Sequence, residues 1–273
     1  MTQTKIVAWV LAVLIAVGSA VFQRMTGPTH PKRISIKTSL FEIDGKLPRS
    51  GYVTKNQLVS IRAKLPDSAK VFVQYRKYRY EENWTEVEMK ASAGDVAVLE
   101  ASLPKMPAAG KLEYTIFVQI DEEKYFIEER SMVIRFKGEV ATTILAPHIF
   151  FIFFSMIMAN YTALSTYLLK KPQIKWVLWT MALLLLGGFV YGPLVQKAAF
   201  GEYWTGFPFG YDLTDNKVLI AMIAWLWALK QKSKPSFHLW IYAAFAITFI
   251  IFLIPHSLLG SELNYNTMEI IQK

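Results

Sequence analysis

Five long apolar segments constrain this chain more than any other feature of its sequence. They run from Ile6 to Phe22, from about Ile144 to Leu169, from Trp176 to about Val195, from Val218 to Leu229 and from about Phe237 to Leu259. In a chain of 273 residues, of which 53% are hydrophobic, such blocks are too long for a soluble core. The sequence therefore predicts an integral membrane protein in contact with the lipid bilayer.

Two lysine clusters indicate how the segments are oriented. Lys170–Lys175 follows the second segment and Lys230–Lys234 follows the fourth. Because short basic loops stay on the cytoplasmic side, we expect a bacterial inner-membrane protein with a cytoplasmic N-terminus. The block between the first two segments and the tail 260–273 are then periplasmic. The formal charge of +9 is explained by these clusters, so we expect no nucleic-acid partner.

The first segment allows two interpretations. Lys5, a short apolar run and the small residues Val17–Ala20 are typical of a cleaved signal peptide. Against this, the apolar run continues through Phe22, which is long enough to span a bilayer. We expect residues 1–23 to be an uncleaved transmembrane anchor. The sequence contains no cysteine, which excludes disulfides, thiolate metal sites and covalently attached c-type haem.

The block 31–139 shows the pattern of an all-β domain. Runs rich in β-branched and aromatic residues alternate with period two, most clearly at Leu112, Tyr114, Ile116, Val118 and Ile120. Turn signals separate roughly seven such runs, which predicts an antiparallel sandwich. The basic run Tyr75–Tyr80 is expected on a solvated edge strand.

One stretch of this block carries a fold-level resemblance. The sequence "LPKMPAAGKLEYTIFV", with Tyr114 after a proline-containing corner, resembles the corner of immunoglobulin and fibronectin type III domains. That resemblance implies an immunoglobulin-like domain inserted between the first and second helices. Such domains bind, space or brace other proteins, so we expect a membrane or periplasmic protein partner.

The region 144–259 is expected to form a four-helix transmembrane domain with two notable histidines. His148 opens the second segment and His256 closes the fifth, so both are placed near the external surface. Helical spacing aligns His148 with a stripe of small residues, which predicts that it faces the bundle. That stripe consists of Ser155, Ala159, Thr162 and Thr166, and His256 shares its face with Phe245, Phe249 and Phe252.

The external loop 198–216 is the most unusual connection in the chain. Asp212 and Asp215 fit the start of a helix, as N-cap and capping-box residue. The loop also carries more rings than an interfacial belt needs, which favours a flat apolar ligand. These rings are Tyr203, Trp204, Phe207, Phe209 and Tyr211.

A second resemblance concerns this loop and the helix after it. The stretch "GEYWTGFPFGYDLTDNKVLIAMIAWLWAL" is similar to the tryptophan-rich loop of the haem-handling membrane proteins of cytochrome c maturation. The match rests on Gly201, Tyr203, Trp204, Tyr211 and Asp212, then on Leu219, Ile220, Trp225 and Leu226. The resemblance implies histidine ligands on flanking helices, here His148 and His256.

Three interpretations of the region formed by His148, His256 and the external loop remain open. The two imidazoles are suited to b-type haem as axial ligands, and apart from haem iron no metal is expected. A quinone is suited to a histidine together with Asp212 or Asp215. In the third interpretation the histidines are interface residues and the loop is an ordered lid.

No catalytic residues are identified, because the sequence has no nucleophile elbow, phosphate loop or H-E-x-x-H motif. We therefore expect an accessory protein of a respiratory or cytochrome-assembly system that is not an enzyme on its own. The alternative is a scaffold without a cofactor, whose immunoglobulin-like domain docks a partner.

Overall fold

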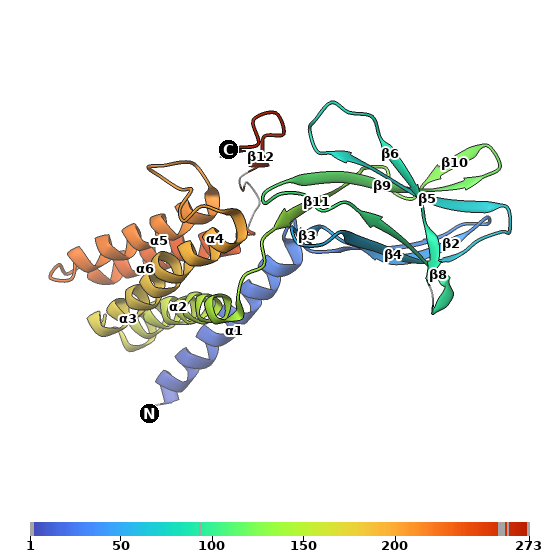
Figure 1. Ribbon diagram of the computed structural model, residues 1–273. Helices are drawn as coiled ribbons and strands as arrows, with labels where there is room; N and C mark the ends of the chain where they lie inside the picture. Colours follow the sequence, from blue (N-terminus) through green and yellow to red (C-terminus); the bar gives the residue numbers. More distant parts are fainter. Residues whose placement is uncertain (1–2, 93, 256–259, 261, 272–273) are drawn as a thin grey trace. The chain divides into compact units, whose positions relative to one another are not determined.

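A computed structural model of the chain describes residues 3–92, 94–255, 260 and 262–271, and it separates into two compact units (Figure 1). The helical unit comprises Met1–Pro28 and Val140–Ser261. The β unit comprises Thr29–Glu139 together with Glu262–Ile271. The chain thus combines apolar helices with a β domain, as the sequence predicts.

The β unit contains two large sheets. The first has five strands in the order β1-β2-β4-β8-β7: β1 (Lys32–Lys37), β2 (Glu42–Leu47), β4 (Gln57–Lys64), β8 (Asp95–Leu103) and β7 (Lys90–Ser92). The second has the order β3-β11-β9-β5-β6, and β10 (Glu123–Phe126) also pairs with β9. Its other strands are β3 (Ser50–Tyr52), β11 (Met132–Lys137), β9 (Lys111–Ile120), β5 (Ala69–Lys77) and β6 (Thr85–Glu88). The pairings are antiparallel except β3 with β11.

The alternating residues of β9 lie in the core, as expected from their period. Leu112, Tyr114, Ile116 and Val118 are buried in one cluster with side chains from both sheets. The Tyr114 hydroxyl donates to the Pro48 carbonyl oxygen at 2.8 Å, and burial raises the pKa of Tyr114. The edge-strand expectation for Tyr75–Tyr80 is wrong at Tyr75, which pairs with both β9 and β6. The pairing with β6 ends there, and Arg76 and Lys77 pair with β9 among the described strands.

The C-terminal segment folds as part of the β unit. β12 (Glu262–Leu263) and β13 (Ile270–Ile271) form a short hairpin. The Glu262 carboxylate lies 2.5 Å from Lys111 Nζ, and the Tyr265 hydroxyl accepts from Lys111 N at 2.6 Å and donates to its carbonyl oxygen. Burial raises the pKa of Tyr265 to about 12, so the hydroxyl keeps its proton for this bond at neutral pH.

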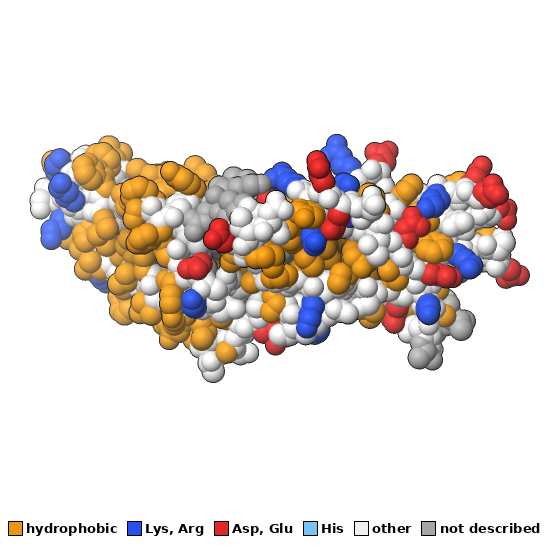
Figure 2. Space-filling view, turned by 45° about the horizontal axis from the view of Figure 1, so that its top comes forward, with side chains coloured by type: hydrophobic (Ala, Val, Ile, Leu, Met, Phe, Trp, Pro, Cys, Tyr) orange, Lys and Arg blue, Asp and Glu red, His pale blue; other side chains and the backbone are white. Residues whose placement is uncertain are grey.

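The helical unit contains three helices long and apolar enough to cross a membrane. They are α1 (Gln3–Thr26), α2 (Thr142–Leu169) and the continuous helix Ile174–Phe200. The last is divided into α3 (Ile174–Leu184), a π-helical turn η1 (Leu185–Tyr191) and α4 (Gly192–Phe200). α5 (Leu213–Lys230) and the shorter apolar α6 (Phe237–Leu253) complete the unit. Figure 2 shows apolar side chains over its visible face, with Lys and Arg gathered at one end.

Helix α1 packs along its length against the other helices. Its small residues Ala8, Ala12 and Ala16 are buried, and Asn160 of α2 donates from Nδ2 to the Ala12 carbonyl oxygen at 3.1 Å. Near the N-terminal end, Trp9 stacks on Tyr161 with ring centroids 4.1 Å apart. The expected division into a four-helix core and a separate anchor is not confirmed, because α1 shares the packing of this unit.

The contacts of the C-terminal segment constrain how often the chain crosses a membrane. Glu262–Ile271 and Thr29–Glu139 belong to one compact unit, so both lie on the same side of any membrane that the helices cross. The number of crossings between Glu139 and Glu262 is therefore even. If α2 and Ile174–Phe200 each cross once, then α5 and α6 either both cross or both do not.

We predict that single cysteines at Ser102 and Thr267 react alike with a membrane-impermeant thiol reagent. Ser102 lies exposed on β8 and Thr267 lies exposed in the C-terminal segment, whereas Ser233 lies exposed between α5 and α6. The natural absence of cysteine makes each variant a single-site probe. In intact spheroplasts, labelling at Ser102 and Thr267 but not at Ser233 is expected. If Thr267 and Ser233 were labelled and Ser102 was not, the C-terminal segment would lie on the opposite side of the membrane from the rest of the β unit, which would contradict the prediction.

Candidate functional site

The π-helical turn η1 lies at the centre of the candidate site. Two glycines allow neighbouring helices to approach it closely. A Cβ at Gly187 would lie 2.8 Å from the backbone nitrogen of Ile152, and a Cβ at Gly188 would lie 2.2 Å from Val218 Cγ1. Gly187 and Gly188 therefore lie where a side chain would collide with α2 and α5. Single π-helical turns inside α-helices occur frequently at functional sites, so the residues around η1 are candidate site residues.

His148 contacts this turn from α2. Its Nδ1 lies 2.9 Å from the Gly187 carbonyl oxygen, which can only accept, so Nδ1 carries the proton and Nε2 is the remaining acceptor. The residues expected to share its stripe, Ser155, Ala159, Thr162 and Thr166, are all buried. His148 thus faces the bundle, as its helical spacing predicts. His256, the second expected ligand, lies outside the described residues.

The loop between α4 and α5 is fastened to the first turn of α5. Asp212 is the N-cap, and its Oδ1 accepts from Thr214 N at 2.8 Å. Asp215 differs from the capping-box expectation. Its Oδ2 accepts from Thr205 N at 2.6 Å and from Thr205 Oγ1 at 3.2 Å. The carboxylate turns towards the loop because the chain folds back and brings the Thr205 amide and hydroxyl to it.

Lys217 is also buried, and it serves a different helix end. Its Nζ donates to the carbonyl oxygens of Ile254 at 2.9 Å and Pro255 at 3.1 Å. Gln23 of α1 donates from Nε2 to the Phe252 and Ile254 carbonyl oxygens at 2.8 and 3.1 Å. Lys217 is therefore held by the carbonyl groups that α6 leaves open at its end. These partners lie on other elements, so the sequence around Lys217 does not indicate them.

The loop rings do not converge on one interior point. Trp204 packs inward, with its ring stacked on Phe189 of η1 at a centroid distance of 5.5 Å and an angle of 20°. The remaining four rings, Tyr203, Phe207, Phe209 and Tyr211, are exposed. Of the predicted site residues, His148 and Trp204 both contact the η1 segment, and Asp212 and Asp215 order the loop. The described residues contain no group of three His, Cys, Asp or Glu side chains placed to hold a metal ion.

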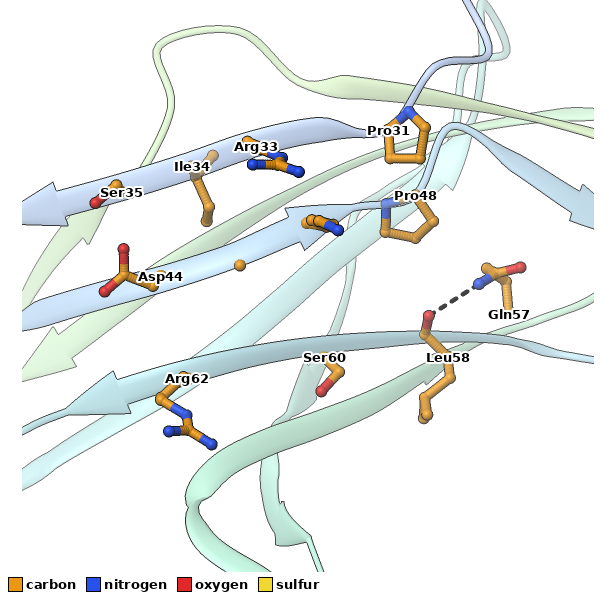
Figure 3. A pocket seen from close by; sticks show the side chains of 12 residues that line it. Pro31, Arg33, Ile34, Ser35, Asp44, Pro48, Gln57, Leu58, Ser60 and Arg62 are labelled. Atoms are coloured by element: carbon orange, nitrogen blue, oxygen red, sulfur yellow. Dashed lines mark hydrogen bonds between the residues drawn. The ribbon is translucent and has the colours of Figure 1, made fainter.

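An open groove crosses the first sheet of the β unit, where no site is predicted from the sequence. Its volume is about 910 Å³, and its lining comes from β1, β2 and β4 and the turns beside them (Figure 3). The charged lining residues are Arg33, Lys46, Arg62 and Asp44, and Leu58 is half exposed beside them. The period-two pattern of β1, with Ile34 buried and Arg33 and Ser35 exposed, is a signal that could have located this face.

Comparison of the chain with protein-family models, with curated proteins and with solved structures found no match. The geometry of the two sites is therefore the basis for the functional proposals.

We predict that Asp215→Ala loosens the loop 201–212. The substitution removes the acceptor of the buried Thr205 amide, which costs about 1–3 kcal/mol when no other partner replaces it. Chymotrypsin should then cleave the detergent-solubilised protein at the loop aromatics at least about tenfold faster. Asp215→Asn keeps an acceptor oxygen, so its cleavage rate is expected to lie between those of the wild type and Asp215→Ala. Equal cleavage of wild type and Asp215→Ala would show that the carboxylate does not order the loop.

Proposed function

We propose that this chain is an accessory scaffold of the bacterial inner membrane whose β unit docks an acidic, extended segment of a partner protein. The observation that carries the proposal is the groove across β1, β2 and β4. On this reading the β unit is an immunoglobulin-like domain on the periplasmic side. The N-terminus is cytoplasmic, as the lysine clusters between the helices favour.

The shape and charge of the groove support this occupant. Three cationic side chains, Arg33, Lys46 and Arg62, line it together with one carboxylate, Asp44, so the balance favours an anionic segment. β1 stands at the end of the strand order, beside the groove. An extended peptide can add to such an edge by main-chain hydrogen bonds. Leu58, of which 50% is exposed, offers an apolar contact within the same surface.

A photocrosslinking amino acid at Leu58 tests the proposal in intact cells. A discrete adduct is expected at Leu58 and not at Phe126, which is 52% exposed on the other sheet. The double variant Arg33→Glu, Lys46→Glu places like charges against an acidic segment, so the adduct should fall by at least about tenfold.

The control for the double variant is Lys70→Glu, on β5 of the second sheet, which should leave the Leu58 adduct unchanged. An adduct at Leu58 that survives the reversal of both groove charges would contradict docking of an acidic segment. Adducts of similar yield at Leu58 and Phe126 would contradict the location.

A second candidate, a b-type haem at His148, has one observation in its favour. Ligating imidazoles commonly donate their other ring N–H to a backbone carbonyl, as His148 does to Gly187. The resemblance of the loop to haem-handling proteins of cytochrome c maturation supports the same site. His256 would be the second ligand. Quinone has less support, because Asp212 and Asp215 already accept hydrogen bonds that order the loop.

An absorption spectrum of protein purified from haem-sufficient cells tests this candidate. Bis-histidine ligation should give sharp α and β bands on reduction, and His148→Ala should abolish or shift them. His238→Ala is the matched control. His238 lies at the N-terminal end of α6, where its Nδ1 contacts the Pro235 carbonyl oxygen, whereas His256 follows the C-terminal end of this helix in the sequence. A wild-type spectrum without a Soret band would rule out haem while leaving the docking proposal intact.

A further inference from the structure

The loop Tyr203–Tyr211 presents its rings on a framework that fixes their direction. Besides the bonds of Asp215 to Thr205, Asn216 Oδ1 accepts from Phe207 N at 2.7 Å. Trp204 Nε1 donates to the Phe207 carbonyl oxygen at 3.1 Å. A Cβ at Gly206 would lie 2.7 Å from Asp215 Cβ, so the loop backbone lies directly on α5. The outward rings are therefore held in place by the opposite side of the loop.

The outer side of the loop is apolar and highly exposed. Phe207 is 64% exposed, Phe209 77%, Tyr211 75% and Tyr203 55%. Between Gly201 and Tyr211 the sequence has one charged residue, Glu202. Contiguous exposed rings of this kind mark a surface that contacts something other than water.

The position of the loop indicates what covers these rings. The apolar helix Ile174–Phe200 has 27 residues, or about 40 Å of length, which matches a hydrocarbon core plus headgroup regions. The loop begins directly at its end, with Gly201 as C-cap, and in Figure 1 it projects from the side of the helical unit. The same helix exposes further apolar side chains at Leu186, Val190 and Leu194.

We propose that the loop Tyr203–Tyr211 is an interfacial anchor that inserts Phe207 and Phe209 at the boundary between lipid headgroups and acyl chains. Tyr203 and Tyr211 suit this depth, because their apolar ring bodies meet acyl chains while their hydroxyls stay near water, and the two phenyl rings between them contact acyl chains. Lys197 lies one turn before the helix end, with Nζ 5.1 Å from the Tyr203 ring, where a cation can meet lipid phosphates. The anchor is independent of the groove and of any cofactor at His148.

The test places a single NBD fluorophore in the Cys-free chain. Phe209→Cys, and Ser102→Cys on the exposed side of β8 as control, are labelled and reconstituted in phosphatidylcholine vesicles. For Phe209→Cys we expect blue-shifted emission and strong quenching by lipids spin-labelled near the headgroup. Quenching should be at least about twofold weaker with the label deep in the acyl chains. Ser102→Cys should be unquenched with emission typical of water.

Two results would overturn the anchor. Emission of Phe209→Cys equal to that of Ser102→Cys, without quenching, would place the rings in water. Blue-shifted emission without quenching by either lipid would show that protein covers them. Repeating the measurement in the Asp215→Ala background tests whether the hydrogen bonds of the loop to α5 fix the depth of the rings. Loss of these bonds should broaden the range of depths at which quenching occurs. An unchanged depth profile would show that the bonds to Asp215 do not set the position of the rings.

Discussion

The helical unit depends on satisfying the backbone groups that its helix ends and the loop between α4 and α5 leave open. In a bilayer no water replaces a missing partner, so each open amide or carbonyl needs a protein group or a position near the surface. Asp215 accepts from the Thr205 amide, while Lys217 and Gln23 donate to carbonyl groups at the end of α6. These bonds connect α1, α5, α6 and the loop into one packed region. These bonds require ionisable and amide side chains inside the helical unit. They therefore account for buried polar residues that would otherwise suggest a path for a transported ion or substrate.

The C-terminal segment gives a second constraint, and it acts on the topology of the whole chain. Glu262 and Tyr265 both bind Lys111, so the chain returns to the β unit after its last helix. α5 is not among the helices that are long and apolar enough to cross a membrane. If α2 and Ile174–Phe200 each cross once, an even number of crossings between Glu139 and Glu262 requires that α5 cross together with α6 or that neither cross. Pairing with α6 is the simplest way for both helices to be embedded. The buried Trp225, whose Nε1 donates to Thr248 of α6 at 2.9 Å, joins the two.

The two units point to different kinds of recognition. In the helical unit the polar side chains of the loop are used for structure, and the outward surface is aromatic and suited to lipid. In the β unit the groove offers cations, one carboxylate and an apolar contact on a sheet face, which suits a polymer chain. Within the helical unit His148 lies against η1, and its Nε2 is the feature that keeps a cofactor interpretation open.

Periodicity determined the parts of the fold that depend on local pattern. The period-two residues of β9 and the small stripe of α2 are buried as predicted, because a face that alternates or recurs at helical spacing can be buried only one way. The short strands β1 and β2 contain no aromatic residue and several exposed charges, so their local pattern is weaker than that of β9. The edge position expected for Tyr75–Tyr80 was wrong at Tyr75, which pairs with strands on both sides, because strand order depends on pairing between distant segments.

The candidate site shows the same division. Sequence alone predicted that the chain combines apolar membrane helices with a β block, that Asp212 caps α5 and that His148 faces other helices, since each follows from a local residue pattern. Only the tertiary structure decided that Asp215 binds Thr205, that Lys217 reaches the end of α6, that the tail joins the β unit and that four loop rings point outward. The reason is physical: a buried polar group takes whichever partner the packing brings within hydrogen-bonding distance, and that partner lies elsewhere in the chain.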